Sequence, residues 1–166
     1  MSIPPVRALL AFVFLLFLAA GLQTTLAPRL VLLGGQPDFV FAVAVAASLL
    51  ADAGGGAVAG FAGGLITAAL VGETVGTLIV SRTLAGFAAG ALGSRLFRAN
   101  AVVLLVGAFL ASLLAQGVYA LSAPAVAARG GAGAVLVGAV ENALIALFVA
   151  LLLRRLGWGP ERDEAA

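Results

Sequence analysis

The sequence predicts an all-α integral membrane protein with six transmembrane helices, and three observations support this prediction. The 166 residues are 63% hydrophobic and only 10% charged, with a mean hydropathy of +1.22, whereas soluble domains are closer to a quarter charged. Apolar runs of nearly spanning length alternate with short breaks rich in glycine, proline or arginine. Two of these runs repeat glycine every four residues, a pattern typical of helices that pack closely in a bilayer.

The six spans are expected at about residues 8–27, 38–53, 57–72, 76–94, 100–122 and 134–153. They form one transmembrane domain, residues 1–156, followed by a polar cytoplasmic tail, residues 157–166. The first span follows a single Arg7 and is long enough to cross a bilayer. We expect it to remain as a helix, because a cleaved signal peptide has a shorter apolar run that ends at a small-residue cleavage site.

The second and third spans are less regular than the others. A turn over residues 34–37 (Gly-Gly-Gln-Pro) precedes the second span, which is short for a complete crossing. The triple glycine at residues 54–56 is expected to break the chain before the third span, and Asp52 is expected to be a solvated loop carboxylate that helps this turn. Two arrangements remain open: both spans cross fully, or they form a re-entrant pair.

The last three spans end at arginine or proline. The fourth ends at Arg95 and Arg98, and the fifth runs from Asn100 and stops before Pro124. The sixth ends at a pair of arginines. In the tail, Trp158 is expected to anchor at the membrane interface, where tryptophan is enriched.

The distribution of arginine predicts the orientation of the bundle. Six crossings place both termini on one side, and most of the arginines fall on that side. Those on the side of the termini are Arg7, Arg95, Arg98, Arg154, Arg155 and Arg162, and those on the other side are Arg29 and Arg129. Because basic residues are enriched in cytoplasmic segments, the side of the termini is expected to be cytoplasmic, with Arg95, Arg98, Arg154 and Arg155 as anchors.

Cysteine and histidine are absent from the sequence, and every basic residue is arginine. Disulfides, thiolate nucleophiles, Cys or His metal sites and Ser–His or Ser–Lys dyads are therefore excluded. The arginines gather at the ends of the spans, which does not suit a phosphate-binding face. The sequence thus predicts a protein that is not an enzyme, holds no cofactor and does not bind nucleic acid.

Two rows of glycine stand out in the middle of the chain. Gly56, Gly60 and Gly64 recur every four residues in the third span, as do Gly86 and Gly90 in the fourth. Residues four apart lie on one face of a helix, so each row forms a stripe almost without side chains. We expect these stripes to tighten the bundle or to receive the helix of a partner protein.

A polar layer is predicted in the outer half of the bundle. Its members come from five spans and are Arg82, Glu141, Gln116, Gln23 and Thr67. Charges within spans are costly and usually face a partner, so we expect Arg82 to pair with Glu141, with the two glutamines adding hydrogen bonds. Alternatively, Arg82 extends to the outer surface or to Glu73 in the loop above it. In either arrangement these groups are expected to be structural rather than reactive.

Several short motifs follow one another in a fixed order along the first four spans. Gln-Thr-Thr-Leu at residues 23–26 ends the first span, and Pro-Asp-Phe at residues 37–39 opens the second. The third and fourth spans carry Gly-Phe-x-x-Gly-Leu at residues 60–65, then Gly76, then Ser-Arg-Thr-Leu-x-Gly-Phe-x-x-Gly at residues 81–90. Together these motifs resemble the family of the bacterial rod shape-determining protein MreD, and the specificity of the resemblance lies in their order and spacing.

The resemblance covers about residues 20–98 and implies a non-enzymatic subunit of the cell-elongation machinery, multi-pass in the bacterial cytoplasmic (inner) membrane. The implied partner is MreC, a bitopic membrane protein whose single helix could lie in a glycine-lined groove. MreB, the RodA polymerase and its class B penicillin-binding protein are implied directly or through MreC, and a homodimer is a further option. Many members carry an acidic residue where this chain has Ala68, so no role for that residue is carried over.

The main alternative follows from a second similarity. The six-helix arrangement of the family is similar to the substrate-binding subunits (S-components) of energy-coupling-factor vitamin transporters. Such a protein needs an outward-facing pocket with convergent polar and aromatic groups, and Gln23, Gln116, Tyr119 and Arg82 lie at a suitable depth. An intramembrane enzyme or a channel is less favoured, because catalytic sets are incomplete and one polar layer is not a pore lining.

Overall fold

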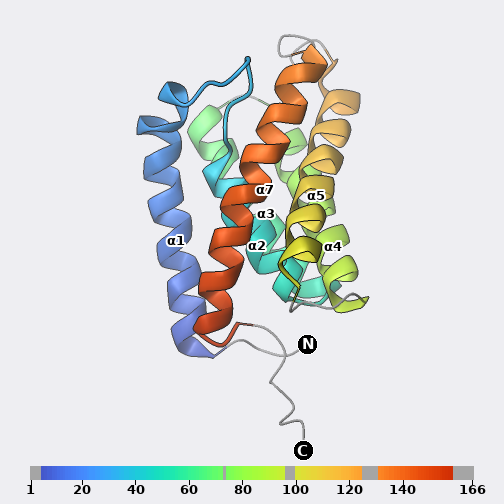
Figure 1. The fold of residues 1–166 in the computed structure, drawn as a ribbon. Coiled ribbons are helices and arrows are strands. Elements are labelled where there is room, and N and C mark those ends of the chain that lie inside the picture. The colour runs from blue at the N-terminus through green and yellow to red at the C-terminus, as the bar shows by residue number, and fades with distance from the viewer. Residues whose placement is uncertain (1–4, 73, 96–99, 125–130, 159–166) are drawn as a thin grey trace, which may run out of the picture.

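The computed structural model describes residues 5–72, 74–95, 100–124 and 131–158, and it is a bundle of helices (Figure 1). In chain order the helices are α1 (Val6–Thr25), the short 3₁₀ helix η1 (Ala27–Arg29), α2 (Phe39–Leu50), α3 (Ala53–Val71), α4 (Val75–Arg95), α5 (Ala101–Ser122) and α7 (Gly131–Arg155). Within the described residues the only β-type pairing is an isolated bridge between Leu32 and Gly35. The prediction of an all-α fold is confirmed, and each predicted span coincides for most of its length with one helix.

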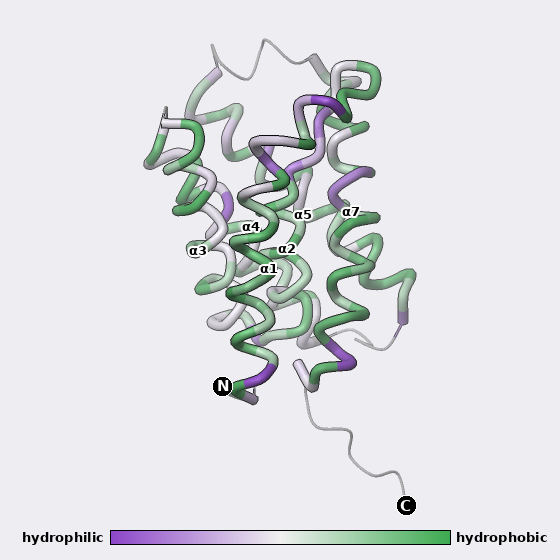
Figure 2. The backbone as a smooth tube through the Cα atoms, turned by 90° about the vertical axis from the view of Figure 1, so that its left-hand side faces the viewer, coloured by the Kyte–Doolittle hydropathy of each residue, from purple (hydrophilic) through white to green (hydrophobic). Residues whose placement is uncertain are grey.

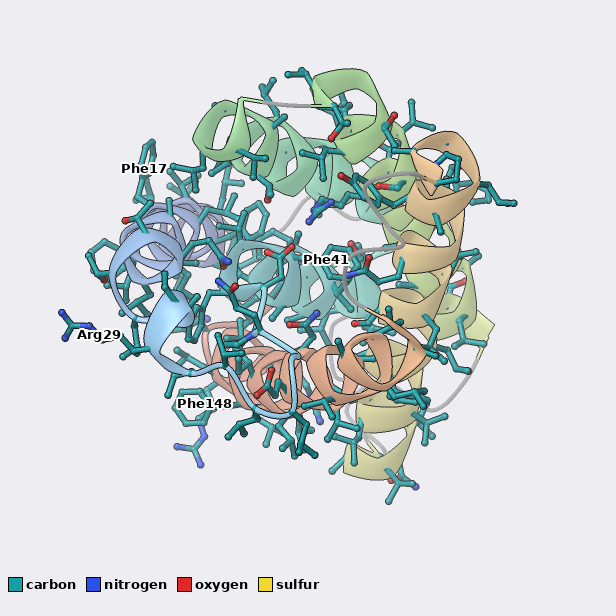
Figure 3. The ribbon with its side chains drawn as sticks, turned by 90° about the horizontal axis from the view of Figure 1, so that it is seen from above. Phe17, Arg29, Phe41 and Phe148 are labelled. Atoms are coloured by element: carbon teal, nitrogen blue, oxygen red, sulfur yellow. The ribbon has the colours of Figure 1, made fainter. Side chains whose placement is uncertain are left out.

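Five of the helices are long and apolar enough to cross a membrane, namely α1, α3, α4, α5 and α7. Hydrophobic residues follow the helices along most of their length, and hydrophilic residues lie mainly towards the two ends of the bundle (Figure 2). Large apolar side chains such as Phe17 and Phe148 point outwards from the bundle and are about 70% exposed (Figure 3). An exposed apolar surface of this extent indicates a multi-pass membrane protein.

The two ends of the bundle differ in what they contain. The start of α1 and the end of α7 lie together at one end, which we call the terminal end (Figure 1). The opposite, or distal, end carries the segment between α1 and α2 and the start of α7 (Figure 1). The candidate site described below lies towards the distal end.

Helix α2 is the centre of the fold rather than a peripheral span. All of its residues except Phe39 are buried, and the other five long helices surround it (Figure 3). With twelve residues it is about 18 Å long, well short of the ~30 Å hydrocarbon core. The second span was predicted to be short, and the structure shows a still shorter helix whose sides all contact protein.

The triple glycine does not break the chain as predicted. Helix α3 already begins at Ala53, and Asp52 is its N-cap residue, with a side-chain oxygen that accepts a hydrogen bond from the backbone N–H of Gly55 at 2.7 Å. This cap satisfies a donor at the helix start, so the glycines can be helical. The turn between α2 and α3 lies instead at Ala51 and Asp52, both in extended conformation.

The two glycine stripes pack against each other and form what we call the glycine seam (Gly56, Gly60, Gly64, Gly86 and Gly90). All five residues are buried between α3 and α4, the helix pair with the most extensive contact. A Cβ built on Gly86 would lie 2.9 Å from the Cα of Gly60, and one built on Gly64 would lie 2.9 Å from the Cα of Ile79. The predicted packing role is correct, but the seam is filled by the chain's own helices and leaves no groove there for a partner helix.

Helix α7 ends in a Schellman motif at the terminal end. Gly157 has φ +87° and donates to the carbonyl of Arg154 at 3.1 Å, and Trp158 donates to the carbonyl of Leu153 at 2.9 Å. The Trp158 ring is only 8% exposed and lies 5.2 Å from that of Phe12 on α1. The motif turns the ring of Trp158 back against α1, so this residue packs on the bundle at its terminal end, and its expected position at the membrane interface stays a prediction.

Candidate functional site: a polar network beside a distal cavity

A non-helical segment, residues 35–38, leads from the distal end down to α2 (Figure 1). Its backbone passes so close to α7 that only glycine fits at residue 35: an added Cβ would lie 2.8 Å from the carbonyl oxygen of Ala134 and from the nitrogen of Gly138. Pro37 follows, buried and without a backbone N–H to satisfy. The segment can thus run inside the bundle with few free polar groups.

Side chains from α1 and α7 bond to backbone groups at the end of this segment and at the start of α2. Gln23 donates to the carbonyl of Pro37 at 3.2 Å and accepts from the N–H of Phe39 at 2.7 Å. The side-chain oxygen of Asn142 accepts from the N–H of Asp38 at 2.7 Å. Non-helical backbone at membrane depth persists only where protein satisfies it in this way.

Asp38 links the segment to α4 through an ion pair with Arg82. One carboxylate oxygen accepts from the N–H of Phe41 at 3.0 Å and caps α2, and the other pairs with the Arg82 guanidinium. The same guanidinium lies 5.5 Å from the centroid of the Phe41 ring, within range of a cation–π contact. The two charged side chains are only 11% and 17% exposed, so their pairing is largely desolvated.

The predicted pairing of Arg82 with Glu141 is wrong, and so is the alternative of an extended, exposed Arg82. Arg82 turns inwards to Asp38, and one Glu141 carboxylate oxygen is buried without a hydrogen-bond partner in the described structure. Glu73 lies outside the described residues. The prediction failed because Asp38 was placed at a helix end near the surface, whereas the extended segment carries it into the bundle.

The structure brings together only part of the predicted polar layer. Gln23 and Arg82 both belong to the network around Asp38. Thr67 is buried, but its hydroxyl donates to the carbonyl of Gly63 on its own helix at 3.0 Å. Gln116 does not join the pair and instead lines a cavity. Asn142 was missed, although a polar residue in an apolar span, one turn after a buried Gly138, was a usable signal.

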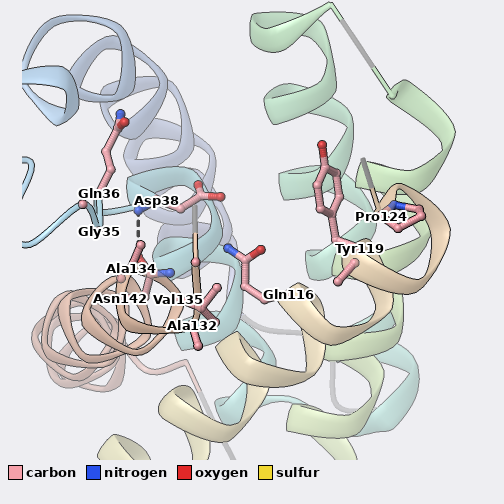
Figure 4. Close-up of a pocket in the computed structure, with 14 residues that line it drawn as sticks. Gly35, Gln36, Asp38, Gln116, Tyr119, Pro124, Ala132, Ala134, Val135 and Asn142 are labelled. Atoms are coloured by element: carbon pink, nitrogen blue, oxygen red, sulfur yellow. Dashed lines mark hydrogen bonds between the residues drawn. The ribbon is translucent and has the colours of Figure 1, made fainter. Parts of the chain in front are cut away.

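A cavity of 570 Å³ lies beside this network at the distal end. It is bounded by the segment before α2, by α5 and by α7, and its lining includes Gly34, Gly35, Gln36, Asp38, Gln116, Tyr119, Ala120, Ala132, Ala134, Val135, Gly138 and Asn142. Asp38, Gln116 and Asn142 direct polar groups towards it from the segment before α2, from α5 and from α7 (Figure 4). The Tyr119 hydroxyl shares a hydrogen bond with that of Thr74 at 3.1 Å.

The groups at this site can donate and accept hydrogen bonds. Asp38 is the one carboxylate among the lining residues, and both of its oxygens are already engaged. Among the described residues, no three His, Cys, Asp or Glu side chains gather as a metal site. A small molecule in the cavity would therefore be held by amide, hydroxyl and backbone groups.

Comparison with protein-family models, curated proteins and solved structures finds no match to this chain. Its function is accordingly inferred from its own residues and their geometry.

Proposed function

We propose that this chain is a non-enzymatic, multi-pass subunit of the bacterial cell-elongation machinery, which binds MreC and supports lateral peptidoglycan synthesis. The observation that supports it best is the convergence of the separate motifs that resemble the MreD family. Gln23 of the first motif bonds to the second motif at Pro37 and Phe39, and Asp38 of the second pairs with Arg82 of the last. Each motif alone is of low complexity. Because these three meet in one network, the resemblance is more specific than their composition alone would make it.

The proposal includes six crossings of the cytoplasmic membrane. The extended segment before α2 adds about 13 Å to the roughly 18 Å of the helix, which together match the ~30 Å hydrocarbon core. Arg7, Arg154 and Arg155 lie at the terminal end, and Arg29 lies at the distal end. This distribution favours a cytoplasmic terminal end. Arg98, Arg129 and Arg162 lie outside the described residues.

The partner would bind outside the glycine seam. Because the seam is internal, the helix of MreC has to use the apolar surface that the bundle presents to lipid, such as the exposed faces of α3 and α4 around Phe61 and Phe87. RodA, the class B penicillin-binding protein and MreB would then associate directly or through MreC. A homodimer would have to use the same kind of surface.

Affinity capture from native membranes tests this proposal. A tagged chain expressed at its native level should retain an MreC-like bitopic protein through purification in mild detergent. The double variant Phe61→Ser and Phe87→Ser tests the α3–α4 face. If the partner uses this face, the two changes to lipid-facing side chains should weaken its retention. Recovery of the folded chain without any such partner would refute the proposal.

The alternative function, an S-component of an energy-coupling-factor transporter for a vitamin or micronutrient, is favoured by one observation. The distal cavity has a size typical of small-molecule sites and convergent polar groups. The same capture experiment separates the two functions, because an S-component should copurify with a pair of ATPases and their membrane coupling subunit.

A further inference from the structure

We propose that the distal cavity is a binding site for an uncharged small molecule that carries a carboxamide group. This inference goes beyond the proposed role in cell elongation and does not depend on it. It rests on the charge balance of the site, on an unused donor of a buried side chain and on the small residues that keep the cavity open.

The charge balance of the site excludes ions as preferred ligands. Asp38 is the one charged residue among those that line the cavity, and Arg82 neutralises it. An anion in the cavity would lie beside the Asp38 carboxylate, and a cation would compete with Arg82 for it. Both arrangements cost more than binding a neutral molecule, because the Asp38–Arg82 pair that they would disturb is largely desolvated.

Asn142 supplies an unused hydrogen-bond donor. Its oxygen is fixed in place because it accepts from the N–H of Asp38, so the amide NH₂ must point the other way. In Figure 4 this group faces the space between α7 and Gln116, and it donates to no other described residue. Asn142 is 4% exposed as a residue, and its amide nitrogen is not among the buried atoms that lack a partner, so solvent in the cavity reaches it and a ligand carbonyl can take the place of that solvent.

Gln116 completes the recognition of a carboxamide. It projects from α5 towards Asp38 and Asn142 and is not held by another residue of the described structure (Figure 4). A ligand carboxamide could accept from Asn142 and donate to the Gln116 oxygen, which matches one donor and one acceptor across the cavity.

The walls of the cavity are made of small residues. Gly34, Gly35 and Gly138 lie on two sides, together with Ala132 and Ala134 at the start of α7. Gly34 has φ +83°, a conformation that favours glycine, and an added Cβ at Gly35 would collide with α7. Gly34 and Gly35 therefore cannot carry larger side chains that would fill the cavity.

A single introduced cysteine allows ligand binding to be measured, because the chain has none of its own. Val135→Cys places the thiol on the lining, and Leu33→Cys, at a residue that is 89% exposed and does not line the cavity, is the control. Benzamide, benzoate and benzamidinium have nearly the same shape and differ in charge. Each is added before a small neutral thiol reagent, and the labelling rate of the purified protein is measured.

Benzamide should slow the labelling of Val135→Cys several-fold and leave that of Leu33→Cys unchanged, whereas benzoate and benzamidinium should protect neither. Adding Gln116→Leu to Val135→Cys should abolish the protection, measured as the ratio of the labelling rates of this double variant with and without benzamide. If Val135→Cys does not fold, Ala120→Cys on the α5 wall replaces it. Protection by either ion as strong as that by benzamide, or no protection by any of the three, would overturn the inference. Neither result affects the capture of MreC.

Discussion

The ion pair between Asp38 and Arg82 can be tested by substitutions that separate its charge from its other roles. Asp38→Asn removes the charge but keeps a side chain that caps α2 about as well, because asparagine and aspartate are similar N-caps. Arg82→Gln removes the opposite charge and keeps much of the length of the side chain. Each single variant leaves one charge without a partner, and the double variant leaves none.

The expected magnitude follows from the burial of the pair. The two side chains are 11% and 17% exposed, and removing one partner of a buried pair costs roughly 3–5 kcal/mol of stability. The loss for Arg82→Gln should be the larger, because the guanidinium also contacts the Phe41 ring. The double variant should recover more than about 1 kcal/mol relative to the sum of the singles, as coupled neighbours do.

The free energies of unfolding can be measured by denaturant titration in mixed micelles. Arg82→Gln combined with Glu141→Gln is the control cycle, and its losses should add to within about 0.5 kcal/mol, because the two residues are not paired. Additive losses for Asp38 and Arg82, or strong coupling between Arg82 and Glu141, would refute the network described here.

Three further predictions concern the packing of the bundle. Gly86→Leu should sharply lower the yield of folded protein measured by gel filtration, because an added Cβ already reaches the backbone of α3. Gly117→Leu is the control and should not lower the yield, because nothing lies within 4 Å of an added Cβ there. Equal yields of the two variants would contradict the packing of the glycine seam. Gln23→Leu should cost about 1–3 kcal/mol for each backbone group it leaves unsatisfied, with the exposed Thr24→Val as a nearly neutral control in the same denaturant titration. Trp158→Ala should lower the stability by roughly 3–5 kcal/mol, and a thermal midpoint that does not change would show that the ring is not packed on Phe12.

The sequence predicted the helices well because apolar length and glycine spacing depend on local composition. Every predicted span overlaps a helix, and the two glycine rows pack as their four-residue period suggested. The depth of Asp38 could not be predicted in the same way. A count of about 1.5 Å per helical residue from the start of the span leaves Asp38 at the end of the bundle, whereas an extended segment advances about 3.3 Å per residue and carries Asp38 into the bundle.

The partners of the polar side chains were harder to predict than their depth. Glu141 was selected as a charge within a span, but its neighbour Asn142 is the residue that bonds to the segment before α2. Successive residues on a helix are rotated by about 100°, so the two side chains point in different directions. Hydropathy does not show which of two neighbouring polar residues faces the interior of the bundle. Helical periodicity shows it only when the buried face of the helix is already known. Gln23 was expected to bond to an Arg82–Glu141 pair, but it instead bonds to the backbone of Pro37 and Phe39, which lie directly beside the end of its own helix.

The position of α2 at the centre of the fold has a consequence for how the protein is made. A ribosome delivers Asp38 before Arg82 and Asn142 exist, so the nascent chain holds a carboxylate and a non-helical stretch that no other residue yet satisfies. A helix of twelve residues is also too short to be retained in lipid by its own length. We therefore expect α2 to settle between its neighbours only after α7 has been synthesised, which makes biogenesis of this protein depend on its last helix.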